Sequence, residues 1–196
     1  KTVEFIQSHK ESTFFIYLCH NMTHNPLAAS PAFKGKSQNG LYGDATEELD
    51  WSMGVLLETL KEEGLDQNTL IIFTSDNGAD EHFGGTNRPL RGQKGTTYEG
   101  GFRVPCIMRW PAKIPAGQET DNLVTSMDFL PTLAHYCGYA VPSDRVIDGH
   151  NVSGILEGES MASPTETFYY YQKQQLQAVQ AAEGLPVYSG QKALPE

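Results

Sequence analysis

The chain has 196 residues, 39% of them hydrophobic, which is enough for one domain with its own hydrophobic core. Its 24 acidic and 14 basic residues give a formal charge of −10, which argues against general nucleic-acid binding because that function needs a basic face. No apolar run approaches the roughly 20 residues of a membrane-spanning helix, so we expect no membrane span.

Apolar residues in the first 18 positions predict a helix and then a strand. Val3, Phe5 and Ile6 within residues 1–10 are typical of the end of a helix, and residues 14–18 form a short apolar run typical of a buried strand. Two histidines, His20 and His24, follow this strand. Because the chain begins without an initiator Met or a leader pattern, we expect an excised or processed piece of a longer protein.

A glycine- and serine-rich loop over residues 30–43 precedes a long helix. Asp44 or Thr46 is predicted to cap this helix, and Gly64 to end it. Apolar residues at three- and four-residue steps predict one buried stripe: Leu49, Met53, Leu56, Leu57 and Leu60. A helix between two apolar strands predicts a βαβ crossover and hence an α/β fold with a largely parallel or mixed sheet flanked by helices.

Residues 70–74 predict a second buried strand that ends at Asp76, Asn77 and Gly78. In open α/β sheets, ligands bind beyond the carboxyl ends of the strands. A glycine-punctuated loop follows, and its positive charges are suited to an anion: Arg88, Arg91, Lys94 and Arg103. A carboxylate, an amide and several cations therefore fall within one short segment.

The remaining chain predicts a strand over residues 106–110, a capped helix over residues 126–137 that ends at Gly138, and a hairpin between residues 168–171 and 176–179. We expect one domain over residues 1–180 and an irregular tail over residues 181–196. The cysteines have no metal-ligand spacing and predict three buried free thiols: Cys19, Cys106 and Cys137.

Each chemical candidate has a structural alternative. Asp76-Asn77-Gly78 is also the sequence of a tight turn, although carboxylate and amide oxygens together suit a hard cation such as calcium or magnesium. Lys94 is either a solvated surface residue or a cation that holds a tetrahedral oxyanion. His24 is either structural or a proton donor to a departing alkoxide. The serine-hydrolase elbow and the glycine motifs of nucleotide-binding folds do not occur in the sequence.

Several of these motifs, in this order, resemble the sulfatases of the alkaline phosphatase-like superfamily. The similar segments are residues 14–18 with Thr23-His24-Asn25-Pro26, residues 42–54, residues 72–78, Leu90-Arg91-Gly92-Gln93-Lys94-Gly95, residues 99–105, residues 128–133 and Asp148-Gly149. The resemblance covers roughly residues 14–179. It identifies the chain as the C-terminal portion of a sulfatase catalytic domain, incomplete at its N-terminus.

The resemblance implies roles for four residues. Asp76 and Asn77 ligate a divalent cation, usually calcium. Lys94 contacts the sulfate, and His24 contacts it and assists the leaving group. The family's nucleophile is the hydrated aldehyde of formylglycine, made from a Cys or Ser in a Cys/Ser-x-Pro-Ser-Arg motif. That motif does not occur here, and no two aspartates are adjacent to match the family's acidic pair near its N-terminus.

We therefore expect part of a sulfuric-ester hydrolase that is inactive as an isolated chain. Its partners are a sulfate ester or sulfated glycan and the missing N-terminal half. One alternative is a degenerate module that binds sulfated glycans through Arg88, Arg91, Lys94 and Arg103 without turnover; the other is a phosphodiesterase of the same superfamily that uses two metals. The resemblance implies a secreted, periplasmic or lysosomal location.

Overall fold

The computed structural model describes residues 1–160 and 162–181, so most of the expected tail lies outside the described residues. The chain divides into two compact units, Lys1–Ala112 and Lys113–Glu196, and each is described by itself. The expectation of one domain over residues 1–180 stays a prediction. No helix within the described ranges is long and apolar enough to cross a membrane.

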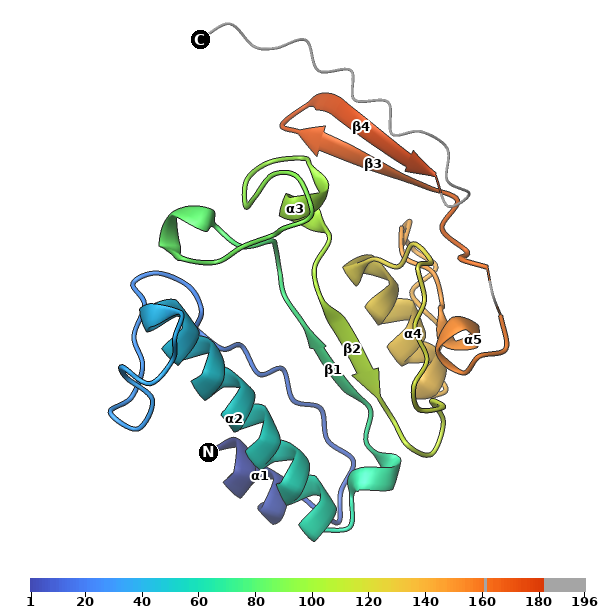
Figure 1. Cartoon of the computed structure of the whole chain (residues 1–196). Coiled ribbons are helices and arrows are strands. Elements are labelled where there is room, and N and C mark those ends of the chain that lie inside the picture. Colours follow the sequence, from blue (N-terminus) through green and yellow to red (C-terminus); the bar gives the residue numbers. More distant parts are fainter. Residues whose placement is uncertain (161, 182–196) are drawn as a thin grey trace, which may run out of the picture. The chain divides into compact units, whose positions relative to one another are not determined.

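The first unit contains three α-helices, two 3-10 turns and two strands (Figure 1). In chain order these are α1 (Thr2–Ser8), α2 (Gly40–Glu62), η1 (Asp66–Asn68), β1 (Ile71–Thr74), η2 (Glu81–Phe83), α3 (Glu99–Phe102) and β2 (Cys106–Arg109). Helix α1 packs against α2. Buried apolar side chains of this unit are Ile6, Ala45 and Leu60.

Both strands of the first unit were predicted, but their pairing was not. β1 pairs with β2 in antiparallel register, with Ile72 opposite Met108. Residues 14–18 form no strand, so the predicted βαβ crossover is wrong for the described residues. Side-chain exposure alternates along this segment as in an extended chain, with Phe15 and Tyr17 75% and 83% exposed and the residue before each less exposed. A strand also needs a hydrogen-bonded neighbour, and periodicity alone does not supply one.

Helix α2 begins earlier than predicted, with Asn39 at its N-cap, so capping by Asp44 or Thr46 is wrong. The Asp44 side chain is instead buried and accepts three hydrogen bonds from the loop before the helix. The backbone N–H groups of Gly35, Lys36 and Ser37 donate to its carboxylate at 2.7, 3.1 and 2.8 Å. These bonds, led by those from Gly35 and Ser37, lower the pKa of Asp44.

The predicted end of α2 is confirmed. Gly64 has φ +73, and the Leu65 N–H donates to the Leu60 carbonyl at 2.8 Å, as in a glycine-terminated helix. The predicted apolar stripe is at least half-buried along its length, and Leu60 is fully buried. The helix therefore packs through that stripe, while Gly54 lies on its exposed face.

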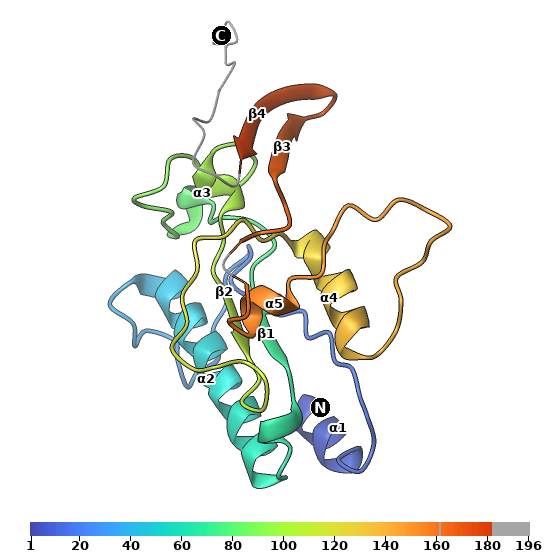
Figure 2. The same cartoon turned by 90° about the vertical axis from the view of Figure 1, so that its right-hand side faces the viewer.

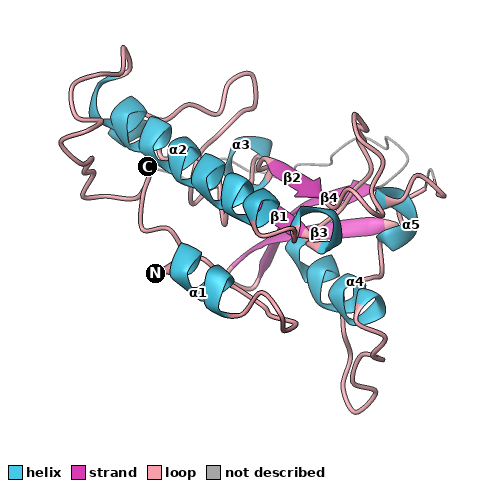
Figure 3. Ribbon diagram, turned by 90° about the horizontal axis from the view of Figure 1, so that it is seen from below, coloured by secondary structure: helices cyan, strands magenta, loops and turns pink. Residues whose placement is uncertain are grey.

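The second unit contains η3 (Ser126–Asp128), α4 (Phe129–Tyr136), α5 (Ser153–Leu156), β3 (Thr167–Gln172) and β4 (Gln175–Ala181). The expected helix with Gly138 at its end and the expected hairpin are both confirmed. β3 and β4 pair antiparallel, and Figure 2 shows them side by side, joined by a tight turn. Figure 3 separates the helices from the strands by colour.

A buried carboxylate organises the helical part of the second unit. Asp128 is 1% exposed and closes a capping box with Thr125, whose N–H donates to Oδ2 at 2.6 Å. Its other oxygen accepts the N–H of His150 at 2.7 Å. Gly149 is required here, because a Cβ at this position would lie 1.9 Å from the Met127 carbonyl oxygen.

The cysteines are free, as predicted, but they are not buried. Cys19, Cys106 and Cys137 are all exposed. Cys106 and Ile107 lie in β2, which has only β1 as a neighbour among the described residues, so their outer surfaces stay uncovered. Apolar sequence context predicts burial only where a further element covers the strand.

Candidate functional site

The candidate site lies in the first unit, where the chain leaves β1. Asp76 and Asn77 lie just beyond the end of the strand, as predicted, with Ser75 between, and the Ser75 hydroxyl donates to the Asn77 carbonyl at 3.0 Å. The Gly78 N–H donates to the Gly101 carbonyl at 3.0 Å. This bond fixes the segment after the strand against α3, which begins at Glu99.

Glycines allow this close approach of backbones. A Cβ on Gly78 would lie 1.8 Å from the Gly100 carbonyl oxygen, and a Cβ on Gly100 would lie 2.1 Å from the Gly92 carbonyl oxygen. Gly100 also donates its N–H to the Arg91 carbonyl at 2.8 Å. Any side chain at these positions pushes the strand end, α3 and the cationic loop apart.

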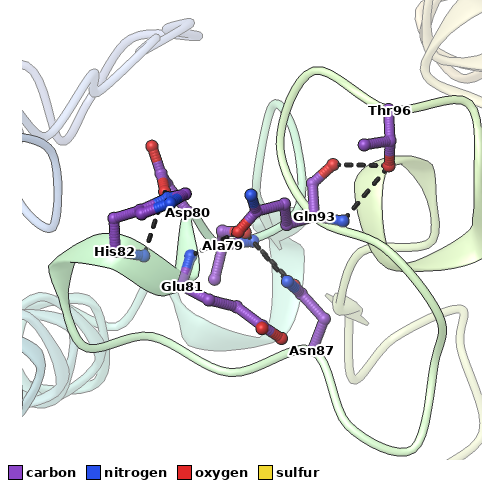
Figure 4. A network of polar contacts seen from close by, with 7 residues as sticks. All are labelled: Ala79, Asp80, Glu81, His82, Asn87, Gln93 and Thr96. Carbon is purple, nitrogen blue, oxygen red and sulfur yellow. Dashed lines mark hydrogen bonds and ion pairs between the residues drawn. The ribbon is translucent and has the colours of Figure 1, made fainter. Parts of the chain in front are cut away.

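Further hydrogen bonds fix the cationic loop to the segment after β1 (Figure 4). The Lys94 N–H donates to the Ala79 carbonyl at 3.1 Å. The Asn87 side chain both accepts from the Ala79 N–H at 2.7 Å and donates to the Ala79 carbonyl at 2.8 Å. The backbone of Lys94 is therefore held near the strand end by hydrogen bonds to Ala79 and its neighbours.

The structure brings together the two residues that were predicted to bind an anion. The Lys94 ammonium lies 2.9 Å from Nε2 of His24, although the residues are 70 positions apart. Nδ1 of His24 lies 2.8 Å from the Asn25 carbonyl oxygen. Because a carbonyl only accepts, Nδ1 carries the ring proton and Nε2 accepts from Lys94. His20 makes no such contact within the described residues.

The predicted cation ligands have oxygen atoms suited to a divalent cation, but the two residues alone do not complete its coordination. The Asp76 carboxylate is exposed and takes part in no hydrogen bond or ion pair within residues 1–160 and 162–181. With the Asn77 amide it offers hard oxygen ligands. No group of three or more His, Cys, Asp or Glu suited to a metal occurs among the described residues. Two ligands are fewer than the 6–8 that calcium takes.

Two of the other predicted cations have partners of their own. Arg103 forms an ion pair with Glu99 at 3.6 Å, and the Arg91 guanidinium lies 4.1 Å from the centroid of the Tyr98 ring. Arg88 donates its backbone N–H to Thr86, and its side chain makes no contact of this kind within the described part of the chain. Lys94 is thus the cation that the fold places against His24.

Sequence reasoning missed a second polar group beside Lys94. Nδ1 of His82 lies 2.8 Å from Oδ1 of Asp80, and the Glu81 N–H donates to the Gln93 side chain at 3.0 Å (Figure 4). The hydrogen bonds from His82, with a smaller contribution from Lys94, lower the pKa of Asp80. The sequence signal for this group was Asp80, a residue type common at helix N-caps. In the structure Asp80 caps η2 by accepting the His82 N–H.

Comparisons with known proteins define the class of protein to which this fold and site belong. The family model described as Sulfatase matches residues 1–139, and a model described as N-sulphoglucosamine sulphohydrolase, C-terminal, matches residues 93–187. The chain therefore belongs to the sulfatase family. Its α/β fold is part of the alkaline phosphatase-like fold, as predicted.

Particular relatives cover nearly all of this chain. It is 43% identical over 187 residues to human steryl-sulfatase, a match that covers 91% of the chain and 32% of that relative. The PsFucS1 sulfatase from Pseudoalteromonas sp. superposes with a TM-score of 0.86 at 34% identity, over 92% of this chain and 37% of the other. The protein BT4656, in complex with its substrate D-glucosamine-2-N,6-O-disulfate, superposes with a TM-score of 0.57 at 28% identity, over 72% of this chain and 29% of the other. The chain thus spans about a third of the length of the curated relatives that it matches.

Proposed function

We propose that the chain supplies the anion-binding half of the active site of a sulfuric-ester hydrolase. One observation carries this proposal: the 2.9 Å contact between the Lys94 ammonium and Nε2 of His24, next to the end of β1. Lys94, and His24 once its Nε2 is protonated, can each donate to a sulfate oxygen, and the backbone of separate segments holds the two residues together. Membership of the sulfatase family supplies the substrate class.

The pair offers both charge and a proton. A sulfate oxygen that accepts from Lys94 replaces Nε2 of His24 as the acceptor, and Nε2 is then available to take up a proton. The ammonium balances the negative charge that grows on the ester oxygens in the transition state. A protonated His24 donates to the departing alkoxide oxygen, while the Asn25 carbonyl holds the ring through Nδ1.

Asp76 and Asn77 would hold a divalent cation, for which we propose calcium. Bound calcium supplies Lewis-acid stabilisation of negative charge on the ester. The remaining ligands, and the formylglycine whose hydrated aldehyde serves as nucleophile in the family, come from sequence outside this chain. We therefore propose that the isolated chain has little or no turnover. From its membership of the sulfatase family we also propose that the whole protein is secreted, periplasmic or lysosomal.

Hydrolysis of an aryl sulfate tests the function. We expect calcium-dependent turnover by the full-length protein that carries this chain, and little by the 196-residue chain alone. In the full-length protein, Lys94→Ala lowers kcat/KM by about 100-fold or more, as expected for loss of a group that stabilises transition-state charge. The matched control is Lys34→Ala, which removes an exposed lysine on the loop before α2.

Three results would contradict parts of the proposal. Substantial calcium-dependent turnover by the 196-residue chain would mean that the nucleophile does not come from elsewhere. Unchanged kcat/KM in Lys94→Ala would remove this lysine from the site. Binding of a sulfated glycan by the full-length protein without turnover would replace the hydrolase with a binding module.

A further inference from the structure

We propose that Asn87 is a positioning residue for the hydrolysis of the sulfate ester, and that it acts by fixing Ala79, which in turn holds Lys94. This inference rests on the proposed function, because it takes Lys94 to contact the sulfate. Both hydrogen bonds that the Asn87 side chain makes within the described residues go to Ala79. The role of Asn87 therefore depends on what Ala79 holds in place.

The Asn87 amide pairs with both backbone groups of Ala79 (Figure 4). Oδ1 of Asn87 accepts the Ala79 N–H at 2.7 Å, and Nδ2 donates to the Ala79 carbonyl at 2.8 Å. Two opposed residues of an antiparallel sheet exchange the same two bonds. The side chain thus serves Ala79 as a neighbouring strand would, and the two bonds together fix both the position and the orientation of its backbone.

Ala79 holds the loop that carries Lys94. The Ala79 carbonyl accepts the Lys94 N–H at 3.1 Å in addition to the Asn87 amide, so both of its lone pairs are used. A further bond joins the same two segments, because the Glu81 N–H donates to the Gln93 side chain at 3.0 Å (Figure 4). Movement of Ala79 is therefore passed to the backbone of Lys94.

Asn87 is held in place by its own backbone. Its carbonyl accepts the Leu90 N–H at 2.9 Å, and the next residue, Arg91, accepts the N–H of Gly100 in α3 at 2.8 Å. The amide also packs against the end of the strand segment, since a Cβ on Gly78 would lie 3.0 Å from Oδ1 of Asn87. Asn87 therefore links α3 to the segment that follows β1.

An amide suits this position because it offers a donor and an acceptor side by side. An ionised aspartate of the same size offers acceptors only, and alanine offers neither. Misplacement of a group in an active site by about 1 Å costs on the order of 100-fold in rate. Without the Asn87 amide, Lys94 keeps its backbone bond to Ala79 but Ala79 is no longer fixed, so we expect a smaller loss of about tenfold.

A double-mutant cycle of Asn87→Ala and Lys94→Ala tests this inference, with hydrolysis of an aryl sulfate by the full-length protein in calcium as the assay. Asn87→Ala should lower kcat/KM by about tenfold, mostly through kcat and with less than about a threefold change in KM, because the Lys94 contact matters most in the transition state. In the Lys94→Ala background the same replacement should change kcat/KM by less than about twofold, since Asn87 acts through Lys94.

Asn122→Ala is the matched control for Asn87→Ala. Asn122 is half-buried like Asn87, but its amide donates to the Thr120 hydroxyl at 2.8 Å, within its own loop. This variant should keep the kcat/KM of the wild type. Circular dichroism at the assay temperature measures whether each variant is folded, so that a loss of kcat is not a loss of folded protein.

The outcomes separate this inference from the function on which it rests. If Lys94→Ala leaves kcat/KM unchanged, the proposed sulfate contact fails. If Lys94→Ala lowers kcat/KM but Asn87→Ala does not, or if the two losses multiply in the double variant, Asn87 does not position Lys94. A raised KM with unchanged kcat in Asn87→Ala would also overturn the inference, because it would mean that Asn87 binds the substrate itself.

Asn87→Asp decides the question should Asn87→Ala not fold. The replacement keeps the size of the side chain and the acceptor for the Ala79 N–H, but at neutral pH it removes the donor to the Ala79 carbonyl. We expect it to lower kcat/KM while Lys94 is present and to have little effect in the Lys94→Ala background. Equal losses in both backgrounds would show a role for Asn87 that does not pass through Lys94.

Discussion

Replacement of Gly100 by alanine tests whether close backbone contact holds the site together. The new Cβ would lie 2.1 Å from the Gly92 carbonyl oxygen and 2.9 Å from the Arg91 carbonyl oxygen, and neither oxygen can rotate away. To relieve the contact, the two backbones must separate by roughly 1 Å. That movement breaks the 2.8 Å hydrogen bond from the Gly100 N–H to Arg91.

The cost follows from these contacts. Loss of one backbone hydrogen bond costs about 1 kcal/mol, and overpacking adds about 1–3 kcal/mol. The sum of about 2–4 kcal/mol lowers the Tm of a chain of this size by roughly 5–15 °C. Thermal unfolding followed by circular dichroism measures the shift, and sulfate titration at 20 °C measures whether the cationic loop has moved.

Gly54→Ala is the matched control for Gly100→Ala. A Cβ on Gly54 meets no atom within 4 Å, and the residue lies on the exposed face of α2. This replacement should stabilise the chain by about 0.5–1 kcal/mol, since alanine favours the helix. Equal Tm values for Gly100→Ala and the wild type would refute the view that glycine contacts position the cationic loop.

Three further predictions concern carboxylates. Asp128→Ala removes the buried acceptor of the N–H groups of Thr125 and His150 and should lower the free energy of unfolding in urea by about 3 kcal/mol. Asp148→Ala, at an exposed position, is the control and should lower it by less than about 0.5 kcal/mol. Similar losses in both variants would contradict the role of Asp128. The pKa of Asp44 is lowered in the folded state, so its stabilising effect is present above the ordinary value of 3.8 and is lost as the pH falls through the lower folded value. The difference in Tm between the wild type and Asp44→Asn should accordingly be large at pH 7 and shrink below about pH 4, and a difference that does not depend on pH would count against this assignment. Calcium at about 100 times its Kd should stabilise the full-length protein by about 2.7 kcal/mol but not its Asp76→Ala variant, and chelation should reverse the effect. Equal stabilisation of Asp76→Ala would exclude Asp76 as a ligand.

Local signals in the sequence predicted most of the elements. Apolar runs located β1 and β2, and Gly64 and Gly138 marked the ends of α2 and α4. These signals act within one turn or one strand, so the local structure that they predict does not depend on which elements pack around it. Residues 14–18 have the same pattern and form no strand among the described residues, since a strand also requires a neighbour distant in the sequence.

Side-chain contacts across long loops could not be predicted in the same way. Asp44 has the sequence position of a helix cap, yet it binds the loop before the helix, because the N-cap of α2 is Asn39 and Asp44 lies inside the helix. The motifs indicated Lys94 and His24 separately, and only the folded chain shows their 2.9 Å contact. Asp80 and His82 were missed because a short acidic segment after a glycine is typical of an exposed loop.

The position of a bound anion tests the central proposal most directly. Selenate has the shape and charge of sulfate, and its anomalous scattering locates it in a crystal of the wild-type chain. We expect the anion within hydrogen-bond distance, about 3 Å, of both the Lys94 ammonium and Nε2 of His24. An anion bound elsewhere, for example at Arg88, or no bound anion at saturating selenate, would contradict the proposal that these two residues form the sulfate site.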